Sequence, residues 1–168
     1  VKTANQNNSN ISIVDTVVQY NSQRKSEMAT KILNELGNNF KNKKVSILGL
    51  SFKPETDDMR DSPSLDIIPI LQEKGITISA YDPVAMDEAK KLLKNIEFAN
   101  DLDTCVHNSD ALVILTEWNE FRSLFPDYLS KHMKGNTVID LRNALDPEKF
   151  VDSNFNLVQI GRARKTNQ

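Results

Sequence analysis

The sequence predicts an α/β fold in which a mostly parallel sheet of about six strands follows one long N-terminal helix. Two observations support this prediction. Short continuous apolar runs alternate with segments of helical periodicity, and Gly, Pro or Asp residues separate the two kinds. Continuous apolar strands are typical of parallel sheets that helices cover on both faces. With 168 residues, of which 39% are hydrophobic and 26% charged, the chain is long enough for one domain with a buried core.

Two segments precede the predicted sheet. Residues 1–10 are rich in Asn, Ser and Gln without apolar periodicity, so we expect a frayed leader there. In residues 11–36, apolar side chains follow helical spacing, which predicts one long amphipathic helix that ends at Gly37. The middle of this helix is polar. We interpret it as a solvated turn between two packing surfaces, and a partner interface is the alternative.

The rest of the chain alternates between strands and helices. The Ser-Pro pair at 62–63 and Gly75 bound the first of these helices, and Asp82-Pro83 marks the turn after the second strand. The expected strands cover residues 45–50, 77–81, 96–99, 111–115, 137–141 and, at an edge, 157–160. The expected helices cover residues 62–74, 86–93, 102–108 and 125–133. Together they predict a Rossmann-like, doubly wound domain.

Composition excludes several classes of function. No two glycines are separated by a single residue, so the Gly-x-Gly-x-x-Gly turn that holds a dinucleotide occurs nowhere. Lys and Arg number 21 against 23 Asp and Glu, and this net charge of -2 disfavours nucleic-acid binding. No apolar run is long enough to span a bilayer, so we expect no membrane partner.

The single cysteine and the two histidines offer no catalytic group. Cys105 excludes an internal disulfide and fits a reducing compartment, so the cytoplasm is the expected location. Its position within a predicted helix indicates a buried, unreactive thiol. His107 and His132 lack acidic or hydroxyl neighbours in the sequence and are expected on helix surfaces. The sequence therefore predicts no metal site and no catalytic dyad.

The segment after the first strand is the first place to search for a site, because ligands of open parallel sheets bind beyond the carboxyl ends of the strands. Residues 51–63 contain two cations, four carboxylates and three hydroxyl groups. An ordinary connection has roughly two to six residues, so this one is too long to be only a link. Lys53, directly after the strand, and Arg60, just before a helix, are candidates for an anion and ribose site. The alternative is a solvated loop in which Arg60 pairs with Asp58 or Asp61.

Two other strand ends carry polar or aromatic groups. Asp82 lies where dinucleotide-binding folds place a ribose-binding acid, although a turn or helix-capping role is the more common one for this residue type. Trp118 and Phe121 follow the strand at 111–115 and are three residues apart. They suit an aromatic lid, but packing against the sheet is the more common arrangement.

Arg142 follows the strand at 137–141 in the segment Asp140-Leu141-Arg142-Asn143. A guanidinium group suits a bidentate contact with a phosphate or a carboxylate. Pairing with Asp140 or Asp146 is the alternative, and both interpretations stay open.

Several motifs resemble the C-terminal domain of UDP-glucose 6-dehydrogenases. The pattern Gly-x-x-Phe-Lys-x-x-Thr-x-Asp-x-Arg-x-Ser-Pro runs from Gly49 to Pro63 and leaves few competing families. Tyr81-Asp82-Pro83, residues 111–118 and residues 139–143 resemble further motifs of that family in the same order. The resemblance covers about residues 10–162, and related UDP- and GDP-sugar dehydrogenases share most of it.

The resemblance implies a three-part parent enzyme that oxidises UDP-glucose to UDP-glucuronate with two NAD and a cysteine thioester. In such an enzyme an N-terminal domain holds NAD, a central helical domain carries the cysteine and dimerises, and a C-terminal domain holds the UDP-sugar. Residues 11–37 then correspond to the end of the central dimerisation region, and residues 43–163 to the UDP-sugar-binding domain. Residues 164–168 are a tail.

The resemblance also implies roles for four residues. Phe52, Lys53 and Arg142 match positions that contact the UDP-sugar, and Arg60 matches an arginine that reaches NAD across the cleft between the domains. The main NAD site and the catalytic cysteine of the family precede residue 1, so Cys105 takes no such role. We therefore expect the chain alone to bind a nucleotide sugar without turning it over.

Two alternatives remain at this stage. The sugar nucleotide of the parent enzyme is UDP-N-acetylmannosamine or GDP-mannose in the first. In the second, the chain is a stand-alone nucleotide-binding or dimerisation module with no enzyme attached.

Overall fold

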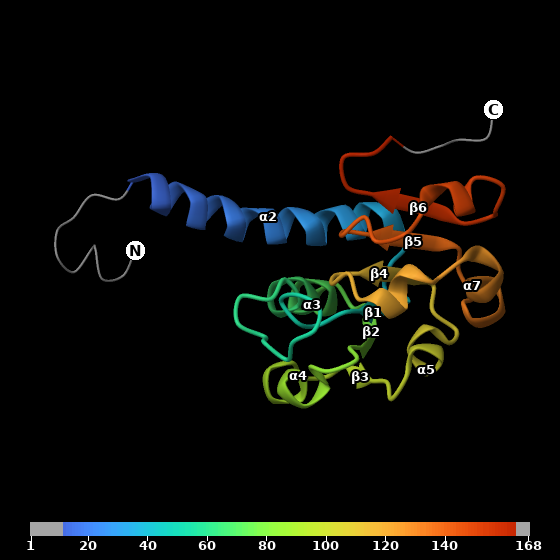
Figure 1. The fold of residues 1–168 in the computed structure, drawn as a ribbon, viewed down its shortest axis with the longest axis horizontal. Helices are drawn as coiled ribbons and strands as arrows, with labels where there is room; N and C mark the ends of the chain where they lie inside the picture. Colours follow the sequence, from blue (N-terminus) through green and yellow to red (C-terminus); the bar gives the residue numbers. More distant parts are fainter. Residues whose placement is uncertain (1–11, 164–168) are drawn as a thin grey trace.

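The computed structural model describes residues 12–163, so the expected leader at 1–10 and the tail at 164–168 lie outside it. Six strands form one all-parallel sheet in the order β3-β2-β1-β4-β5-β6 (Figure 1). The strands are β1 (Lys44–Leu48), β2 (Thr77–Tyr81), β3 (Glu97–Phe98), β4 (Ala111–Ile114), β5 (Thr137–Asp140) and β6 (Asn156–Gln159). The prediction of a doubly wound α/β sheet of about six strands is confirmed, and β6 is an edge strand as expected.

The register aligns the carboxyl ends of the four central strands. Leu48 of β1 pairs with Tyr81 of β2 and with Ile114 of β4. Ile114 in turn pairs with Asp140 of β5. Because these residues form one row across the sheet, the segments that follow them emerge side by side at the same edge.

Helices cover both faces of the sheet, which explains the continuous apolar strands. The helices are α2 (Ser12–Leu36), α3 (Ser64–Glu73), α4 (Met86–Leu92), α5 (Leu102–Val106), α6 (Asn119–Arg122) and α7 (Pro126–His132), with the 3-10 turn η1 (Pro147–Phe150). One core cluster joins α2, α3 and α4 to inward residues such as Ile47. A second joins α5, α6 and α7 to inward residues such as Leu112. The single-turn elements α6 and η1 are absent from the sequence prediction, because one turn is too short to show helical periodicity.

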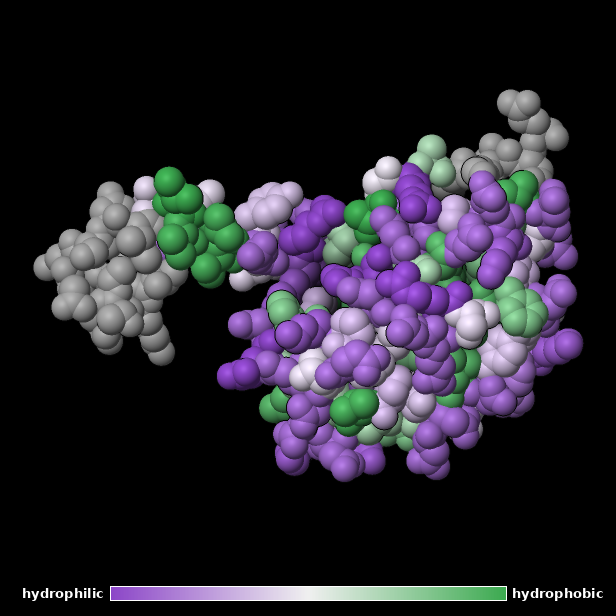
Figure 2. Space-filling model, in the orientation of Figure 1, coloured by the Kyte–Doolittle hydropathy of each residue, from purple (hydrophilic) through white to green (hydrophobic). Residues whose placement is uncertain are grey.

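Helix α2 packs on the domain only through its C-terminal part. Ala29, Ile32 and Leu36 are buried there, and Gly37 with φ +76° ends the helix as predicted. Figure 1 shows the N-terminal part projecting beyond the sheet. In Figure 2, hydrophobic side chains gather on this projecting part, where Ile13, Val14, Val17 and Val18 are exposed. Tyr20 is exposed on the same part of the helix.

The polar middle of α2 lies where the helix meets the domain. Lys25 reaches Asp66 of α3 with a 2.7 Å ion pair. Among the described residues, only the part of α2 after this polar turn packs against the domain. The apolar side chains before the turn are exposed. No helix among residues 12–163 is both long and apolar enough to cross a membrane.

Candidate functional site

The candidate site lies where the strand order reverses, between the carboxyl ends of β1 and β4. Gly49 leaves β1 with φ +87°, and a Cβ atom there would lie 2.5 Å from the Cβ of Thr116 and 2.7 Å from its nitrogen. Only glycine fits this contact between the two strand exits. The Thr116 hydroxyl donates to the carbonyl of Ser51 at 2.7 Å, which joins the segments that follow β1 and β4. In open α/β sheets, ligands bind at such a reversal point.

The β1–α3 loop, residues 49–63, is fixed at its far end by two serines. The hydroxyl groups of Ser62 and Ser64 both donate to the carbonyl of Leu50, at 2.6 Å and 2.7 Å. Helix α3 therefore begins at Ser64, after the predicted start at residue 62, because Ser62 bonds back to the loop and Pro63 takes the N-cap position. Met59 is buried in the core and anchors the loop between its ends.

Asp82 fixes the near end of the loop and has a structural role. Its side chain is fully buried after β2. It accepts hydrogen bonds from the nitrogens of Leu50, Ser51, Val84 and Ala85, the Ser51 hydroxyl and the Trp118 indole. The turn role expected for Asp82 is thus the observed one, and a ribose is left with no free carboxylate oxygen there. Trp118 packs in the core instead of forming a lid, and Phe121 is fully buried with it.

Phe52 and Lys53 are presented on the outside of this fixed loop. Phe52 is 51% exposed, so an aromatic surface is available to a ligand beside Lys53. The Phe52 nitrogen donates to the carbonyl of Asp58 at 2.9 Å, which closes the loop on itself behind the two side chains. Lys53 is exposed and forms no salt bridge with any residue of the described range. Its ammonium charge is therefore not neutralised by a direct partner.

Arg60 pairs with Asp58, one of the two alternatives that the sequence left open. Its Nε and Nη2 donate to the two carboxylate oxygens at 2.9 Å and 2.8 Å. These bonds, together with one from the Arg60 nitrogen, lower the pKa of Asp58 to about 2. The Arg60 side chain is 90% exposed, so the pair stands in solvent at the tip of the loop.

Arg142 pairs with a carboxylate that the sequence analysis missed. Its Nε and Nη2 donate to Glu117 at 2.5 Å and 2.9 Å. The guanidinium pairs with neither of the predicted partners, Asp140 and Asp146. Asp140 accepts from the nitrogens of Arg142 and Leu145 and from the Gln159 amide, and Asp146 accepts from the nitrogen of Glu148 at the start of η1.

The Glu117–Arg142 pair follows from the strand register. Ile114 and Asp140 are paired, so Glu117 and Arg142 follow neighbouring strands by three and two residues. Only knowledge of that pairing would have identified this partner. The contact from Arg142 holds the pKa of the Glu117 carboxyl below its usual value. The site thus presents Arg142 with a fixed orientation at the same edge of the sheet as Lys53.

The remaining predictions concern Cys105 and the histidines. Burial raises the pKa of the Cys105 thiol to about 12, so it is inert as expected. His107 is exposed next to Asn108, and His132 stacks on Tyr128 with ring centroids 4.5 Å apart. In the part of the chain that the structure describes, no group of three or more His, Cys, Asp or Glu residues is placed to hold a metal ion.

The β1–α3 loop does not fit the pyrophosphate of a dinucleotide. In dinucleotide-binding folds, a short glycine-rich turn leads from the first strand directly into a helix N-terminus. Here residues 49–63 separate β1 from α3, and Gly49 is their only glycine. The main site for NAD is therefore not formed by this turn.

Comparisons with known proteins agree with this geometry. The model of the UDP-binding domain of the UDP-glucose/GDP-mannose dehydrogenase family matches residues 46–147. The chain is 40% identical over 162 residues to a UDP-glucose 6-dehydrogenase of Rhizobium meliloti, covering 96% of this chain and 37% of that protein. It is 34% identical over 151 residues to UDP-glucose 6-dehydrogenase TuaD of Bacillus subtilis, covering 89% and 32%. The chain thus spans about a third of the length of these curated relatives.

Solved structures share the fold. An NDP-N-acetyl-D-galactosaminuronic acid dehydrogenase of Methanosarcina mazei is similar with a TM-score of 0.70 and 26% identity, over 84% of this chain and 29% of that one. A UDP-glucose dehydrogenase of Pyrobaculum islandicum has a TM-score of 0.69 and 21% identity, over 96% and 35%. At that identity the second likeness supports the fold alone.

Proposed function

Because this chain belongs to the UDP-glucose/GDP-mannose dehydrogenase family through its UDP-binding domain, we propose that it forms the nucleotide-sugar-binding wall of a UDP-glucose 6-dehydrogenase. The whole enzyme would oxidise UDP-glucose to UDP-glucuronate with two NAD in the cytoplasm. The names of the curated relatives reported above favour glucose over N-acetylmannosamine or GDP-mannose as the sugar nucleotide. A stand-alone module has less support, because this chain matches only a third of those proteins.

The observation that carries this proposal is the unpaired charge of Lys53. It stands on a loop that Asp82, Ser62 and Ser64 fix at both ends, beside the point where the strand order reverses. A lysine ammonium is a compact point charge suited to the oxygens of a diphosphate. Since the loop is already ordered, little conformational entropy is lost when such an anion binds. The exposed Phe52 ring would lie against the sugar or base.

Arg142 would supply the second cationic contact. Nε and Nη2 of Arg142 donate to Glu117, while Nη1 of Arg142 forms no hydrogen bond within the described range. A guanidinium group has five N–H donors, so the pair still presents donors to a phosphate. Glu117 would act here as a positioning residue, because it fixes the plane of the guanidinium before the ligand arrives.

Arg60 would contact NAD from across the cleft. Its side chain is 90% exposed and stands in solvent. The part of the enzyme that binds most of the NAD, and the part that carries the catalytic cysteine, would precede this chain. The chain alone would therefore bind UDP but produce no NADH.

The projecting half of α2 would belong to the central region of the enzyme. Its exposed apolar side chains, from Ile13 to Tyr20, form a surface that a monomeric domain rarely leaves in water. We propose that this surface is covered in the whole enzyme, where it would contribute to a homodimer.

Calorimetric titration of the chain with UDP tests the proposal. We expect Lys53→Ala to weaken UDP binding about tenfold, the loss of roughly one charge-assisted contact. Lys131→Ala is the matched control, since it removes the same charge from α7, whose end contacts Asn108 at the opposite edge of the sheet. Equal binding by the wild type and Lys53→Ala would remove Lys53 from the site. NADH formation by this chain alone would contradict the proposal that the main NAD site and the catalytic cysteine lie in other parts of the enzyme.

A further inference from the structure

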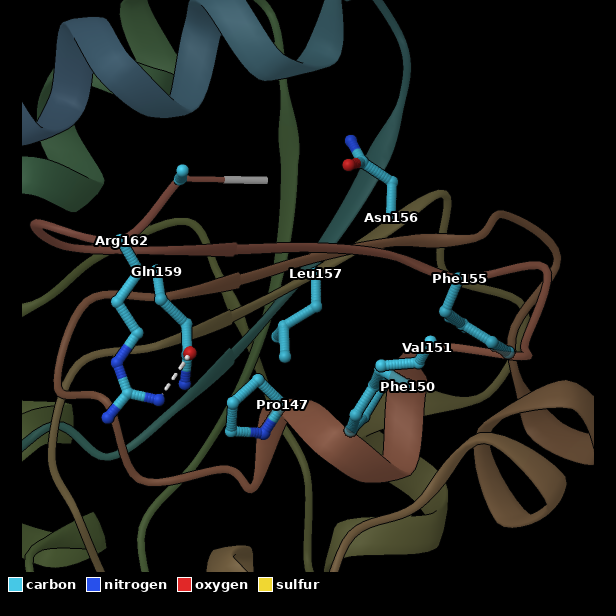
Figure 3. Close-up of a pocket in the computed structure, with 9 residues that line it drawn as sticks. Pro147, Phe150, Val151, Phe155, Asn156, Leu157, Gln159 and Arg162 are labelled. Carbon is cyan, nitrogen blue, oxygen red and sulfur yellow. Dashed lines mark hydrogen bonds between the residues drawn. The ribbon is translucent and has the colours of Figure 1, made fainter. Parts of the chain in front are cut away.

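A second concave site lies at the far edge of the sheet, between η1 and β6. Its volume is about 290 Å³. Figure 3 shows Leu157 of β6 and Pro147 of η1 pointing toward each other across it, with Phe150 and Val151 beside them. None of Phe52, Lys53 and Arg142 lines this cavity, so it is separate from the nucleotide site proposed above.

Part of the cavity wall is formed by apolar side chains that pack on one another. Phe150 is buried, and its ring packs edge-on against the ring of Phe155 with centroids 6.4 Å apart. Pro147, Val151 and Leu157 are partly buried. Side chains that are held in this way form a rigid surface for an apolar group. The volume is close to the lower limit of roughly 300 Å³ for small-molecule pockets, so the cavity suits a small ligand.

A cation stands at one end of this apolar surface. Nη1 of Arg162 donates to Oε1 of Gln159 at 3.2 Å, the contact drawn in Figure 3. An amide oxygen carries no net charge, so it orients the guanidinium without neutralising it. Arg162 forms no salt bridge with any residue in the 12–163 range.

Buried contacts fix the Gln159 side chain in turn. Gln159 is buried, and its Nε2 donates to Asp140 and to the carbonyl of Leu145, each at 2.9 Å. Both hydrogens of the amide are thereby used on the inner side, which leaves Oε1 turned toward Arg162. Arg162, the cation at this end of the cavity, is thus oriented by a side chain that buried groups hold in place.

We propose that this cavity binds a small monoanion with a single-ring or similarly compact apolar body. The apolar body would lie between Leu157 and Phe150, and a carboxylate or similar group would pair with Arg162. Because Asp140 also accepts from the nitrogen of Arg142 at 3.1 Å, the anion end of the cavity and the substrate-side arginine share one buried carboxylate. Occupancy of the cavity should therefore be detectable at the Arg142 amide.

The test is an NMR titration of the chain with 3-phenylpropionate, which has one ring and one carboxylate. We expect saturable shifts of the amides of Val151, Leu157 and Arg162, with a dissociation constant on the order of 1 mM for a ligand of this size. The neutral 3-phenylpropan-1-ol should bind about tenfold more weakly, because it cannot form the charge-assisted contact.

Two variants separate the site from nonspecific binding. Arg162→Gln should weaken 3-phenylpropionate about tenfold and leave the alcohol unchanged. Lys149→Gln removes one charge from η1 without lining the cavity, so it should change neither affinity. Both side chains are exposed, so both variants should keep the fold of the wild type in circular dichroism. Absence of saturation, or equal affinities of acid and alcohol for the wild type, would overturn the proposal.

Discussion

The guanidinium of Arg142 is held by the carboxylate of Glu117 through two hydrogen bonds, of 2.5 Å from Nε and 2.9 Å from Nη2. The two residues are 25 positions apart in the sequence and meet because β4 and β5 are paired with Ile114 opposite Asp140. The pairing fixes the orientation of a cation at the ligand-binding edge of the sheet. Because both side chains are partly exposed, its contribution to stability is small, typically below about 1 kcal/mol.

The first prediction concerns the acid sensitivity of this pair. The folded protein lowers the pKa of Glu117, so the pair stabilises the fold above the ordinary carboxyl pKa, and this stabilisation is lost as the pH falls through the lowered value. In Glu117→Gln this part of the pH dependence should disappear, so the free energy of unfolding should fall less steeply on the acid side of pH 4.5. Urea unfolding at a series of pH values measures this slope. Identical slopes in the two proteins would show that the pair does not form in solution.

The second prediction concerns Asp82. In Asp82→Asn, one of the two carboxylate oxygens becomes an NH₂ group that cannot accept a hydrogen bond. The buried donors that face this group, either Leu50 and Ser51 or Val84 and Ala85, therefore lose their acceptor. We expect the free energy of unfolding to fall by about 2–4 kcal/mol, as for other broken buried networks. The control is Asp87→Asn on α4, whose side chain is 91% exposed and which should change stability by less than about 0.5 kcal/mol. Similar effects of the two substitutions would refute the structural role of Asp82.

The third prediction tests the contact at the strand reversal. Gly49→Ala places a methyl group 2.5 Å from the Cβ of Thr116 at a positive φ, so backbone must move. We expect a loss of more than about 2 kcal/mol in unfolding free energy, from steric overlap added to backbone strain. Gly161 has a similar φ of +70°, and a Cβ atom added there would have nothing within 4 Å. Gly161→Ala therefore measures the cost of the backbone strain without steric overlap. If both variants lose equal stability in thermal unfolding, the two strand exits are not in contact.

Local patterns predicted the sheet but not the links between its strand ends. Residues 77–81 are a strand both in the prediction and in the structure, because Gly75 and Asp82-Pro83 bound a short apolar run. Helix α5 ends at Val106, two residues before the predicted end, because His107 leaves the helical conformation with ψ 126° and Asn108 then adopts a positive φ of 55°. The donors of Asp82 and the partner of Arg142 come from strands that are distant in sequence, so no local pattern reveals them. The exposure of Phe52 depends on how the whole loop is folded, so the local sequence does not reveal it.

The central claim is that Lys53 and Arg142 jointly bind the diphosphate of a UDP-sugar at the carboxyl edge of the sheet. The most direct measurement is an NMR titration of the chain with UDP, read at each backbone amide. We expect the largest shifts in residues 50–54 and 140–143, with no comparable shifts at the amino ends of the strands or along the exposed half of α2. Shifts confined to another surface, or no shift at saturating UDP, would contradict the claim.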